Sequence, residues 1–275
     1  DLCRYFNDFC AVDSLTFSVD EGEIFGFLGP NGAGKTTTIR MLSGQLDPSS
    51  GTARVAGCDV KSEIQRLKPR IGVVSDYQNL YERMTARENL IFAAKLYGVD
   101  CSKVETLLQK FHLEDRAKEP IKNFSNGMKQ RLLIARALIH NPSVLFLDEP
   151  TRGLDPISAQ DIHMMINDLS NEGTTVFLTT HYMEEADHLC KHVAFINLGK
   201  IVALDTPENL KITHGKSYLE AKLKDGTKKK FELALADTGQ KVAELINSGQ
   251  LLTLHSAEAT LEEVFLKLTG SRIDA

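Results

Sequence analysis

The feature that most constrains the fold is one eight-residue segment, Gly29–Thr36, which reads Gly-Pro-Asn-Gly-Ala-Gly-Lys-Thr. It matches the pattern GxxxxGK[ST] without deviation. Glycines let the backbone wrap closely around an anion, and Lys35 adds a full positive charge beside the phosphate oxygens. An apolar run precedes the segment and a helical pattern follows it, so the positive end of a helix faces the same anion. The sequence therefore predicts a nucleoside triphosphate site that consists of Gly29, Pro30, Asn31, Gly32, Ala33, Gly34, Lys35, Thr36 and Thr37.

A second apolar run, 144–147, ends in two carboxylates, Asp148 and Glu149. Ligands of open α/β sheets bind beyond the carboxyl ends of the strands. Asp148 is placed to hold Mg²⁺ through a water, and the hydroxyl of Thr36 is a hard oxygen ligand for the same ion. Glu149 can reach the attacking water as a general base. An ordinary exposed loop after a strand is the alternative, which the neighbouring phosphate motif makes weaker.

His181 follows a third strand-like run, 175–180, again at a carboxyl end. From there it could donate a hydrogen bond to the γ-phosphate of a bound nucleotide. A purely structural histidine explains its position equally well.

Apolar runs that alternate with helical patterns predict a mixed, mainly parallel α/β sheet of the P-loop NTPase class. The predicted central strands are 24–28, 71–74, 144–147 and 175–180. A helical insert at about 79–140 interrupts this core. Capping-box patterns at Thr85 with Glu88 and at Ser102 with Glu105 predict two of its helices, and a third follows Ser125.

The pattern changes after about residue 212, where alternating apolar residues flank the turn Asp225-Gly226. A hairpin, a helix, a short strand at 251–254 and a capped helix from Thr260 are predicted. We therefore expect two domains, 1–212 and 213–275, the second a small α+β appendage. The run Lys228–Lys230 is more simply a solvated loop than a binding patch.

Bulk composition excludes several function classes. Hydrophobic residues make up 42% and charged residues 25% of the chain, and its net charge of −5 predicts no nucleic-acid partner. Five scattered cysteines without a CxxC pair indicate reduced thiols in a cytosolic protein. We found neither a signal-peptide pattern nor an apolar run of about 20 residues, so we expect any action at a membrane to need a partner.

The order of these motifs resembles that of an ABC transporter nucleotide-binding domain. Between the phosphate loop and Asp148 lie Gln78, in the position of the family's Gln loop, and 124–131, Phe-Ser-Asn-Gly-Met-Lys-Gln-Arg, in that of its signature. The D-loop segment 153–156 and Thr-Thr-His-Tyr-Met-Glu-Glu-Ala-Asp around His181 follow. The resemblance covers residues 1 to about 212. The signature departs from LSGGQ at three positions, Phe124, Asn126 and Met128.

The resemblance implies roles for further residues. Tyr5 would stack on adenine, although a core tyrosine is nearly as plausible. Gln78 would contact Mg²⁺ or the attacking water and sense a membrane subunit. Ser125, Asn126 and Gly127, with Asp155 of the D-loop, would bind the ATP held by a second subunit.

The same resemblance implies the partners. We expect a dimer of two ATPase subunits, closed by ATP, on the cytoplasmic face of a membrane that holds a separate permease. The segments 23–30, 128–131, 181–187 and 259–270 resemble the prokaryotic drug, antibiotic and lipid export class. A non-transport ABC ATPase that acts on ribosomes or DNA is the alternative. A P-loop kinase or GTPase would leave the signature and His181 unexplained.

Overall fold

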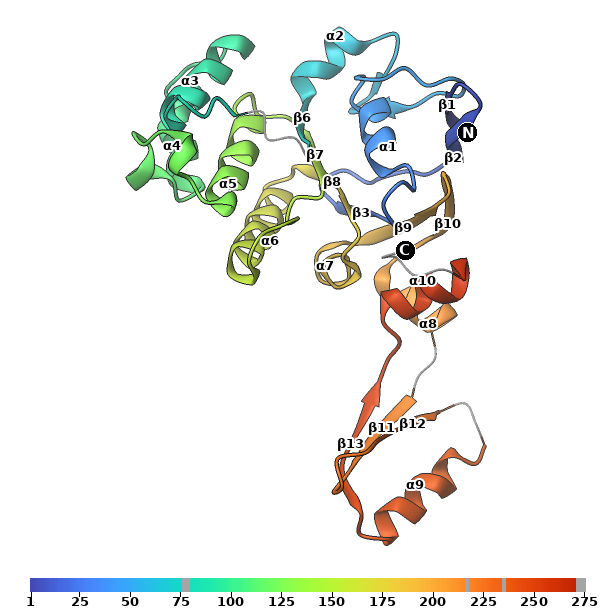
Figure 1. The fold of residues 1–275 in the computed structure, drawn as a ribbon. Helices are drawn as coiled ribbons and strands as arrows, with labels where there is room; N and C mark the ends of the chain where they lie inside the picture. Colours follow the sequence, from blue (N-terminus) through green and yellow to red (C-terminus); the bar gives the residue numbers. More distant parts are fainter. Residues whose placement is uncertain (76–79, 216–217, 234–235, 271–275) are drawn as a thin grey trace.

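The computed structural model describes residues 1–75, 80–215, 218–233 and 236–270. Figure 1 shows a central sheet, a group of helices beside its β6 edge, and a smaller sheet with one helix that projects beyond α8 and α10. In the described ranges, no helix combines the length and apolar character that a bilayer crossing requires.

A six-stranded sheet forms the centre, in the order β10-β9-β3-β8-β7-β6. Its strands are β3 (Ile24–Leu28), β6 (Ile71–Val74), β7 (Val144–Asp148), β8 (Thr175–Thr180), β9 (His192–Asn197) and β10 (Lys200–Asp205). All neighbouring pairs are parallel except β9 and β10, which confirms the mixed, mainly parallel α/β prediction. The β3 side chains are buried on both faces, as strands covered by helices on two sides require.

The two faces of the sheet carry different layers. Below the sheet in Figure 1 lie α6 (Pro156–Asn171) and α7 (Met183–Leu189). The other layer consists of α1 (Lys35–Leu42), α2 (Ile64–Leu67), the 3-10 turn η1 (Lys68–Arg70), the hairpin β1 (Leu2–Phe6) with β2 (Phe9–Leu15), and the ribbon β4 (Arg54–Val55) with β5 (Cys58–Asp59). Stacked phenylalanines join this layer to the sheet, with the Phe17 and Phe25 ring centroids 5.6 Å apart.

The helical insert is confirmed as α3 (Ala86–Tyr97), α4 (Lys103–Lys110), η2 (Glu114–Arg116), η3 (Ile121–Asn123) and α5 (Asn126–Ala137). Thr85 and Glu88 form the predicted capping box. The second predicted box is wrong, because Ser102 makes no side-chain cap bond. Instead the Asp100 carboxylate accepts a hydrogen bond from the Ser102 N–H at 3.0 Å, and this bond lowers the pKa of Asp100.

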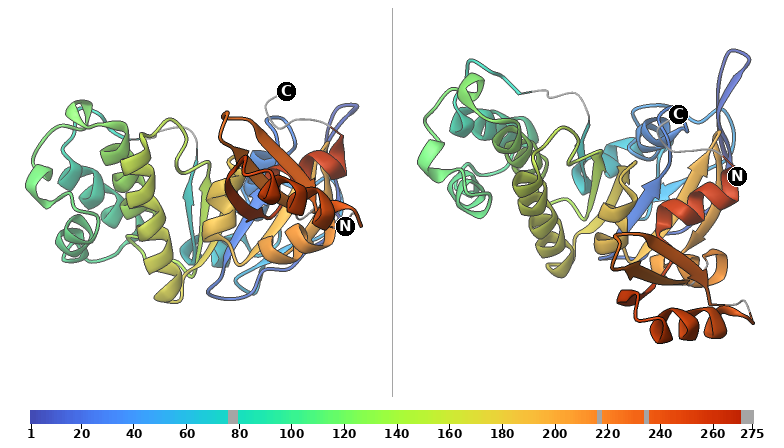
Figure 2. Two further views of the ribbon diagram at one scale, coloured as in Figure 1. Left: turned by 90° about the horizontal axis from the view of Figure 1, so that it is seen from below. Right: turned by 60° about the horizontal axis from the view of Figure 1, so that its bottom comes forward.

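The elements after β10 fall into two groups, one packed beside the central sheet and one that projects from it. The helices α8 (Pro207–His214) and α10 (Leu261–Thr269) pack against each other beside the central sheet, and the ring of Phe265 meets that of Phe195 edge-on at 5.5 Å. The strands β11 (Tyr218–Leu223), β12 (Lys228–Glu232) and β13 (Leu251–Ala257), with α9 (Thr238–Asn247), form the projecting part. Figure 2 shows this part from two further sides. The predicted hairpin turn at Asp225-Gly226 is confirmed, with a φ of 89° at Gly226.

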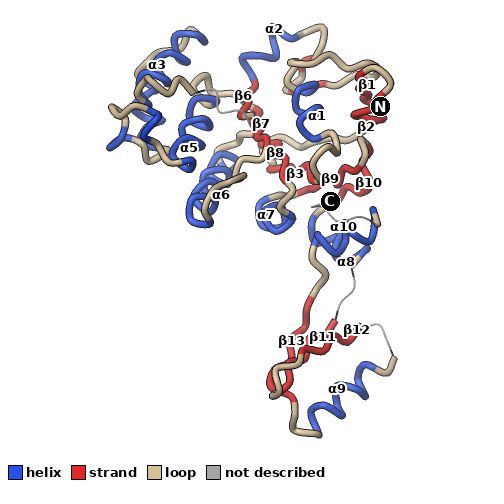
Figure 3. Tube along the Cα trace, in the orientation of Figure 1, coloured by secondary structure: helices blue, strands red, loops and turns tan. Residues whose placement is uncertain are grey.

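The division into 1–212 and 213–275 stays a prediction. The helix α10 falls on the C-terminal side of that division, yet Leu261, Val264 and Phe265 belong to the same apolar core as the central sheet. Figure 3 colours helices and strands differently and shows α10 beside α8, away from β11, β12, β13 and α9.

Candidate functional site

The phosphate-loop segment joins the carboxyl end of β3 to α1. Gly34 precedes α1 with a φ of 109°, a conformation that L side chains rarely adopt, and a Cβ there would lie 2.6 Å from the Ala11 carbonyl oxygen. A Cβ on Gly29 would lie 2.2 Å from the carbonyl oxygen of Ile196. The surrounding backbone therefore requires glycine at both positions.

Lys35 carries a buried positive charge at the start of α1. Its Nζ donates to the carbonyl oxygens of Gly29 and Pro30 at 2.6 and 3.2 Å, and lies 3.3 Å from Oε1 of Glu149. Burial lowers the pKa of Lys35, whereas the charges of Glu149 and Asp148 oppose that shift. The loop thus holds an ammonium group against a carboxylate in a site with little solvent.

Asp148 links the phosphate loop to two neighbouring strands. Its Oδ2 accepts a hydrogen bond of 2.8 Å from the hydroxyl of Thr36, which lies 112 residues earlier in the chain. Its Oδ1 accepts from the hydroxyl of Thr179, the residue opposite Asp148 in the pairing of β7 with β8. Hydroxyl and carboxylate oxygens thus meet at one point, and these are the donor atoms that Mg²⁺ prefers.

Glu149 follows β7 with a φ of 50°, uncommon for a residue other than glycine. Its N–H donates to the Thr179 carbonyl oxygen at 3.0 Å, which fixes this backbone. Its Oε2 lies 3.1 Å from Nδ1 of His181, an ion-pair distance without hydrogen-bond angles, and 3.7 Å from Nε of Arg152. The structure therefore brings the predicted base, the predicted histidine and Lys35 together.

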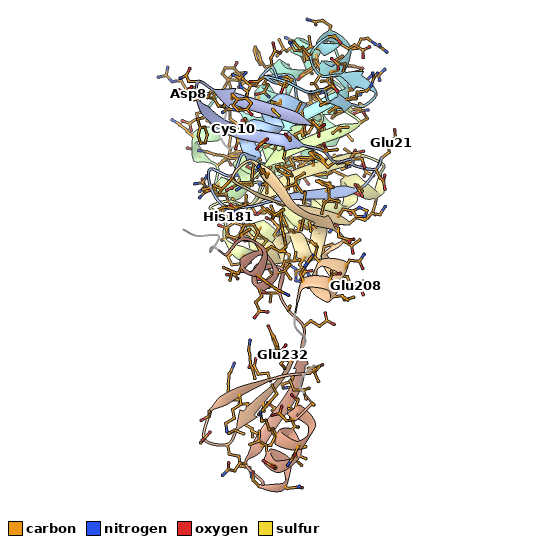
Figure 4. All side chains as sticks on the ribbon, turned by 90° about the vertical axis from the view of Figure 1, so that its right-hand side faces the viewer. Asp8, Cys10, Glu21, His181, Glu208 and Glu232 are labelled. Carbon is orange, nitrogen blue, oxygen red and sulfur yellow. The ribbon has the colours of Figure 1, made fainter. Side chains whose placement is uncertain are left out.

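A hollow of about 320 Å³ opens beside Lys35 and Glu149, and His181 is not among the described residues that line it. Its lining residues are Phe6, Phe9, Ala11, Pro30, Asn31, Gly32, Gly34, Lys35, Thr36, Thr37, Asp148, Glu149 and Arg152. Two predicted loop residues, Gly29 and Ala33, are not part of this lining. Figure 4 shows His181 and the tip of the β1–β2 hairpin, labelled by Asp8 and Cys10, toward one side of the molecule and Glu21 toward the other.

The aromatic residue at the hollow differs from the prediction. Tyr5 does not line the hollow, whereas Phe6 does. Successive side chains of a strand point to opposite faces, so a shift of one residue exchanges the side chain that faces the loop. The guanidinium carbon of Arg4 lies 4.5 Å from the centroid of the Phe6 ring and packs on one of its faces.

The predicted signature residues lie at the start of α5. The hydroxyl of Ser125 accepts a hydrogen bond from the Met128 N–H at 3.2 Å and caps the helix. Asn126 is the first residue of α5, and a Cβ on Gly127 would lie 2.6 Å from Oγ of Ser158. None of Ser125, Asn126 and Gly127 is among the described residues that line the hollow.

Asp155 caps the neighbouring helix α6, where it accepts from the Ser158 N–H at 3.0 Å and from its hydroxyl at 2.7 Å. These bonds lower the pKa of Asp155. Gln78 lies outside the described residues.

Sequence reasoning missed four residues that line the hollow, Phe6, Phe9, Ala11 and Arg152, and also Thr179, which donates to Asp148. Phe6 could have been recognised from the alternation of side chains along a strand, which puts Tyr5 and Phe6 on opposite faces. Thr179 could have been found by aligning β8 with β7. Arg152 has no comparable signal, because its place in the hollow depends on the turn after Glu149, in which the Arg152 N–H donates to the Glu149 carbonyl oxygen at 3.2 Å.

Residues 12–152 match the family described as ABC transporter. The chain belongs to this family. It is 40% identical over 267 residues to the fluoroquinolones export ATP-binding protein of Mycobacterium tuberculosis, a match that covers 96% of this chain and 89% of the relative. It is 36% identical to the daunorubicin/doxorubicin resistance ATP-binding protein DrrA of Streptomyces peucetius, covering 99% of this chain and 92% of the relative.

Solved structures agree with the family assignment. An ATP-binding subunit of an ABC transporter aligns with a TM-score of 0.70 and 30% identity, over 77% of this chain and 90% of its own. The cbiO1 protein of Clostridium perfringens, part of the ABC transporter complex cbiONQ, aligns with a TM-score of 0.71 and 26% identity, over 77% and 88%.

The predicted fold class and activity are confirmed by these relatives. The ABC transporter family member described here is the ATP-binding and ATP-hydrolysing subunit of a transporter, and its P-loop core is the ABC ATPase fold. Because its relatives are transporter subunits, transport is favoured over action on ribosomes or DNA.

We expect Phe6→Ala to weaken binding of a slowly hydrolysed ATP analogue about tenfold, because stacking of one base on an aromatic ring contributes about 1–3 kcal/mol. Tyr5→Ala is the matched control, since the two side chains are exposed to 42% and 45%. Calorimetry measures both affinities. A loss confined to Tyr5→Ala would instead assign the stacking role to Tyr5.

Proposed function

We propose that this subunit drives export of a cargo through a separate membrane permease by binding and hydrolysing ATP between two of its copies or a copy and a paralogue. The observation that carries the proposal is the convergence of Lys35, Thr36, Asp148, Glu149 and His181 at one edge of the sheet. Each group has the charge or donor type that one part of a bound triphosphate requires.

Binding of the triphosphate relies on the loop from Gly29 to Thr37. Its backbone N–H groups and the N-terminus of α1 face the phosphates, while Lys35 pairs with the β- and γ-phosphate oxygens. Phe6 takes the adenine on its free face, with Phe9 beside it at the same hollow. We therefore assign to Phe6 the stacking on adenine that was first predicted for Tyr5.

Thr36 and Asp148 would hold Mg²⁺, Asp148 through a water, with Gln78 as a further predicted contact. Their hydroxyl and carboxylate oxygens form a hard donor set, and magnesium usually keeps several waters and needs few protein ligands. When bound, the ion would neutralise charge on the phosphate oxygens.

Hydrolysis uses Glu149 as the general base. The carboxylate accepts a proton from a water, whose oxygen forms a bond to the γ-phosphorus as the bond to the bridging β–γ oxygen breaks, which gives ADP and phosphate. His181, beside this carboxylate, donates a hydrogen bond to the γ-phosphate. Gln78 helps to orient the water.

A second subunit completes the site. The N-terminus of α5, with Ser125, Asn126 and Gly127, suits a phosphate but is not part of its own chain's hollow. In a head-to-tail pair, this helix end meets the nucleotide held by the other chain, with Asp155 of each chain near the contact. Bound ATP then stabilises the closed pair and hydrolysis weakens it.

The permease would bind the helical subdomain. Four exposed apolar residues, Tyr81, Phe92, Leu96 and Tyr97, lie on or just before α3. The rings of Tyr81 and Phe92 meet edge-on at 5.0 Å, and the ring of Tyr97 stacks on His140 at 3.9 Å. Such an apolar surface suits a short helix of a membrane subunit, which would place the chain at the cytoplasmic face of the membrane.

The class of cargo is proposed by analogy with the relatives, and a role for the C-terminal segment by analogy with the family. One relative is named for fluoroquinolone export and another for daunorubicin and doxorubicin resistance, so we propose a drug or antibiotic as the cargo. Residues 213–275 would form a second domain with a regulatory or dimer-supporting role. The net charge of −5 supports no nucleic-acid partner.

Glu149→Gln should lower kcat for ATP hydrolysis at least about 100-fold, because a positioned general base contributes about 10²–10⁴-fold. ATP affinity should stay close to that of the parent chain, since the amide keeps the shape of the side chain. Glu184 is exposed, so Glu184→Gln serves as the control and should keep the parent rate. Phosphate release and calorimetry are the measurements, and a Glu149→Gln variant with the parent rate excludes the base role.

Leu96→Glu should reduce the fraction of tagged chain that remains on washed membranes of the source cells, because it puts a charge into the apolar surface of α3. Ile212→Glu is the matched control, since Leu96 and Ile212 are both helical and exposed to 74% and 72%. Equal membrane fractions for the two variants would contradict the proposed permease surface. Both purified variants should retain the parent ATP affinity.

A further inference from the structure

Glu185 is a carboxylate within the protein interior. It lies on α7, four residues after His181, and its side chain is only 3% exposed. Acidic side chains are rarely buried unless they have partners. The partners of Glu185 therefore indicate what its burial achieves.

Three segments of the chain meet at one oxygen of this carboxylate. Oε1 accepts a hydrogen bond of 2.8 Å from the hydroxyl of Thr151, itself buried, and one of 2.9 Å from Nε2 of His163. Thr151 follows Glu149 by two residues. His163 lies on α6, whose first turn is capped by Asp155. Glu185 therefore joins the loop of the proposed base, the helix behind the D-loop and the helix that follows His181.

The second oxygen makes a stability role less plausible. Within the described ranges, Oε2 is buried and has no hydrogen-bond partner. A buried polar atom without a partner costs free energy, so stability alone does not explain a carboxylate at this place. Burial raises the pKa of the nearby Cys190 thiol well above its usual value, and the negative charge of Glu185 raises it further.

The loop held by Thr151 is short and tightly turned. The Arg152 N–H donates to the Glu149 carbonyl oxygen at 3.2 Å, and the Leu154 N–H donates to the Thr151 carbonyl oxygen at 3.1 Å. Movement of Thr151 would therefore move the backbone of Glu149. A misplacement of about 1 Å in a reacting group can reduce a rate about 100-fold.

We propose that Glu185 is a positioning residue for ATP hydrolysis, which fixes Glu149 and His181 relative to each other through its bonds to Thr151 and His163. The proposal rests on the roles proposed above for Glu149 and His181. Glu185 itself touches neither nucleotide nor water in this role. It sets the geometry of the two groups that do.

The chain offers a matched control in Glu23. This carboxylate is also only 3% exposed, and its Oε2 accepts from Nδ1 of His192 at 2.8 Å. It lies just before β3, at the amino end of the strand. Figure 4 shows the neighbouring Glu21 on the side of the molecule opposite to His181. The two glutamates thus share burial and a histidine partner but differ in distance from the site.

The experiment compares steady-state hydrolysis and thermal unfolding of the full chain. Glu185→Ala should lower kcat about tenfold or more, with KM for ATP within about twofold of the parent value. Glu185→Gln should retain most of the rate, because its amide oxygen can accept both hydrogen bonds. Glu23→Ala should lower the melting temperature as Glu185→Ala does, but leave kcat unchanged.

Thr151 provides a second variant in case Glu185→Ala does not fold. Thr151→Val keeps the shape of the side chain but removes its hydroxyl, and should lower kcat like Glu185→Ala, while Thr151→Ser restores it. The double variant should lose no more than either single one, because both remove the same contact.

The proposal is overturned if Glu185→Ala or Thr151→Val keeps the parent kcat, or if Glu23→Ala lowers kcat equally. These outcomes are separable from failure of the proposed function. If Glu149→Gln loses its rate while Glu185→Ala does not, only the positioning role fails. If Glu149→Gln keeps its rate, the base role of Glu149 fails, and with it the premise of the positioning role.

Discussion

The parallel pairing of β3, β8 and β7 is the constraint on which the site depends. Leu28 pairs with Thr180, and Thr179 with Asp148, so the three strands end at one edge of the sheet. Residues that are far apart in sequence thereby become neighbours. Without this register the hydroxyl of Thr36 could not reach Asp148, and Lys35 could not reach Glu149. The layers around the sheet serve mainly to hold these three strand ends in place.

The same edge concentrates charge at a cost to stability. Lys35 and Glu149 are both largely buried. The free-energy cost of removing their two charges from water offsets much of the attraction between them. The positive φ of Glu149 adds strain of about 1–3 kcal/mol. Such costs persist where the chemistry needs them. Three hydrogen bonds hold this arrangement: the Glu149 N–H donates to Thr179, the Thr179 hydroxyl donates to Asp148, and the Thr151 hydroxyl donates to Glu185.

Local sequence patterns predicted most of the elements that form the site. They did not predict contacts between segments that are far apart in the sequence. The phosphate loop, the central strands and the caps at Thr85 and Thr260 follow from patterns of a few residues. The sequence alone does not show that Phe6, and not Tyr5, lines the hollow, because the face of an edge hairpin depends on its register against the loop. At Ser102 the backbone N–H donates to Asp100, which takes the place predicted for the Glu105 carboxylate. The contacts of α10 and of Glu185 could not be predicted, because they need segments that only the folded chain brings together.

The proposal that two chains enclose each ATP can be tested by sedimentation velocity with Mg²⁺ and ATP. On a Glu149→Gln background, Ser125→Asp and Ser125→Asn both retain a helix-capping side chain, but only the first puts a negative charge where the other chain's triphosphate would lie. The account predicts a dimer for the background and for Ser125→Asn, and a monomer for Ser125→Asp. A background that stays monomeric, or a dimer that tolerates Ser125→Asp equally well, would contradict it.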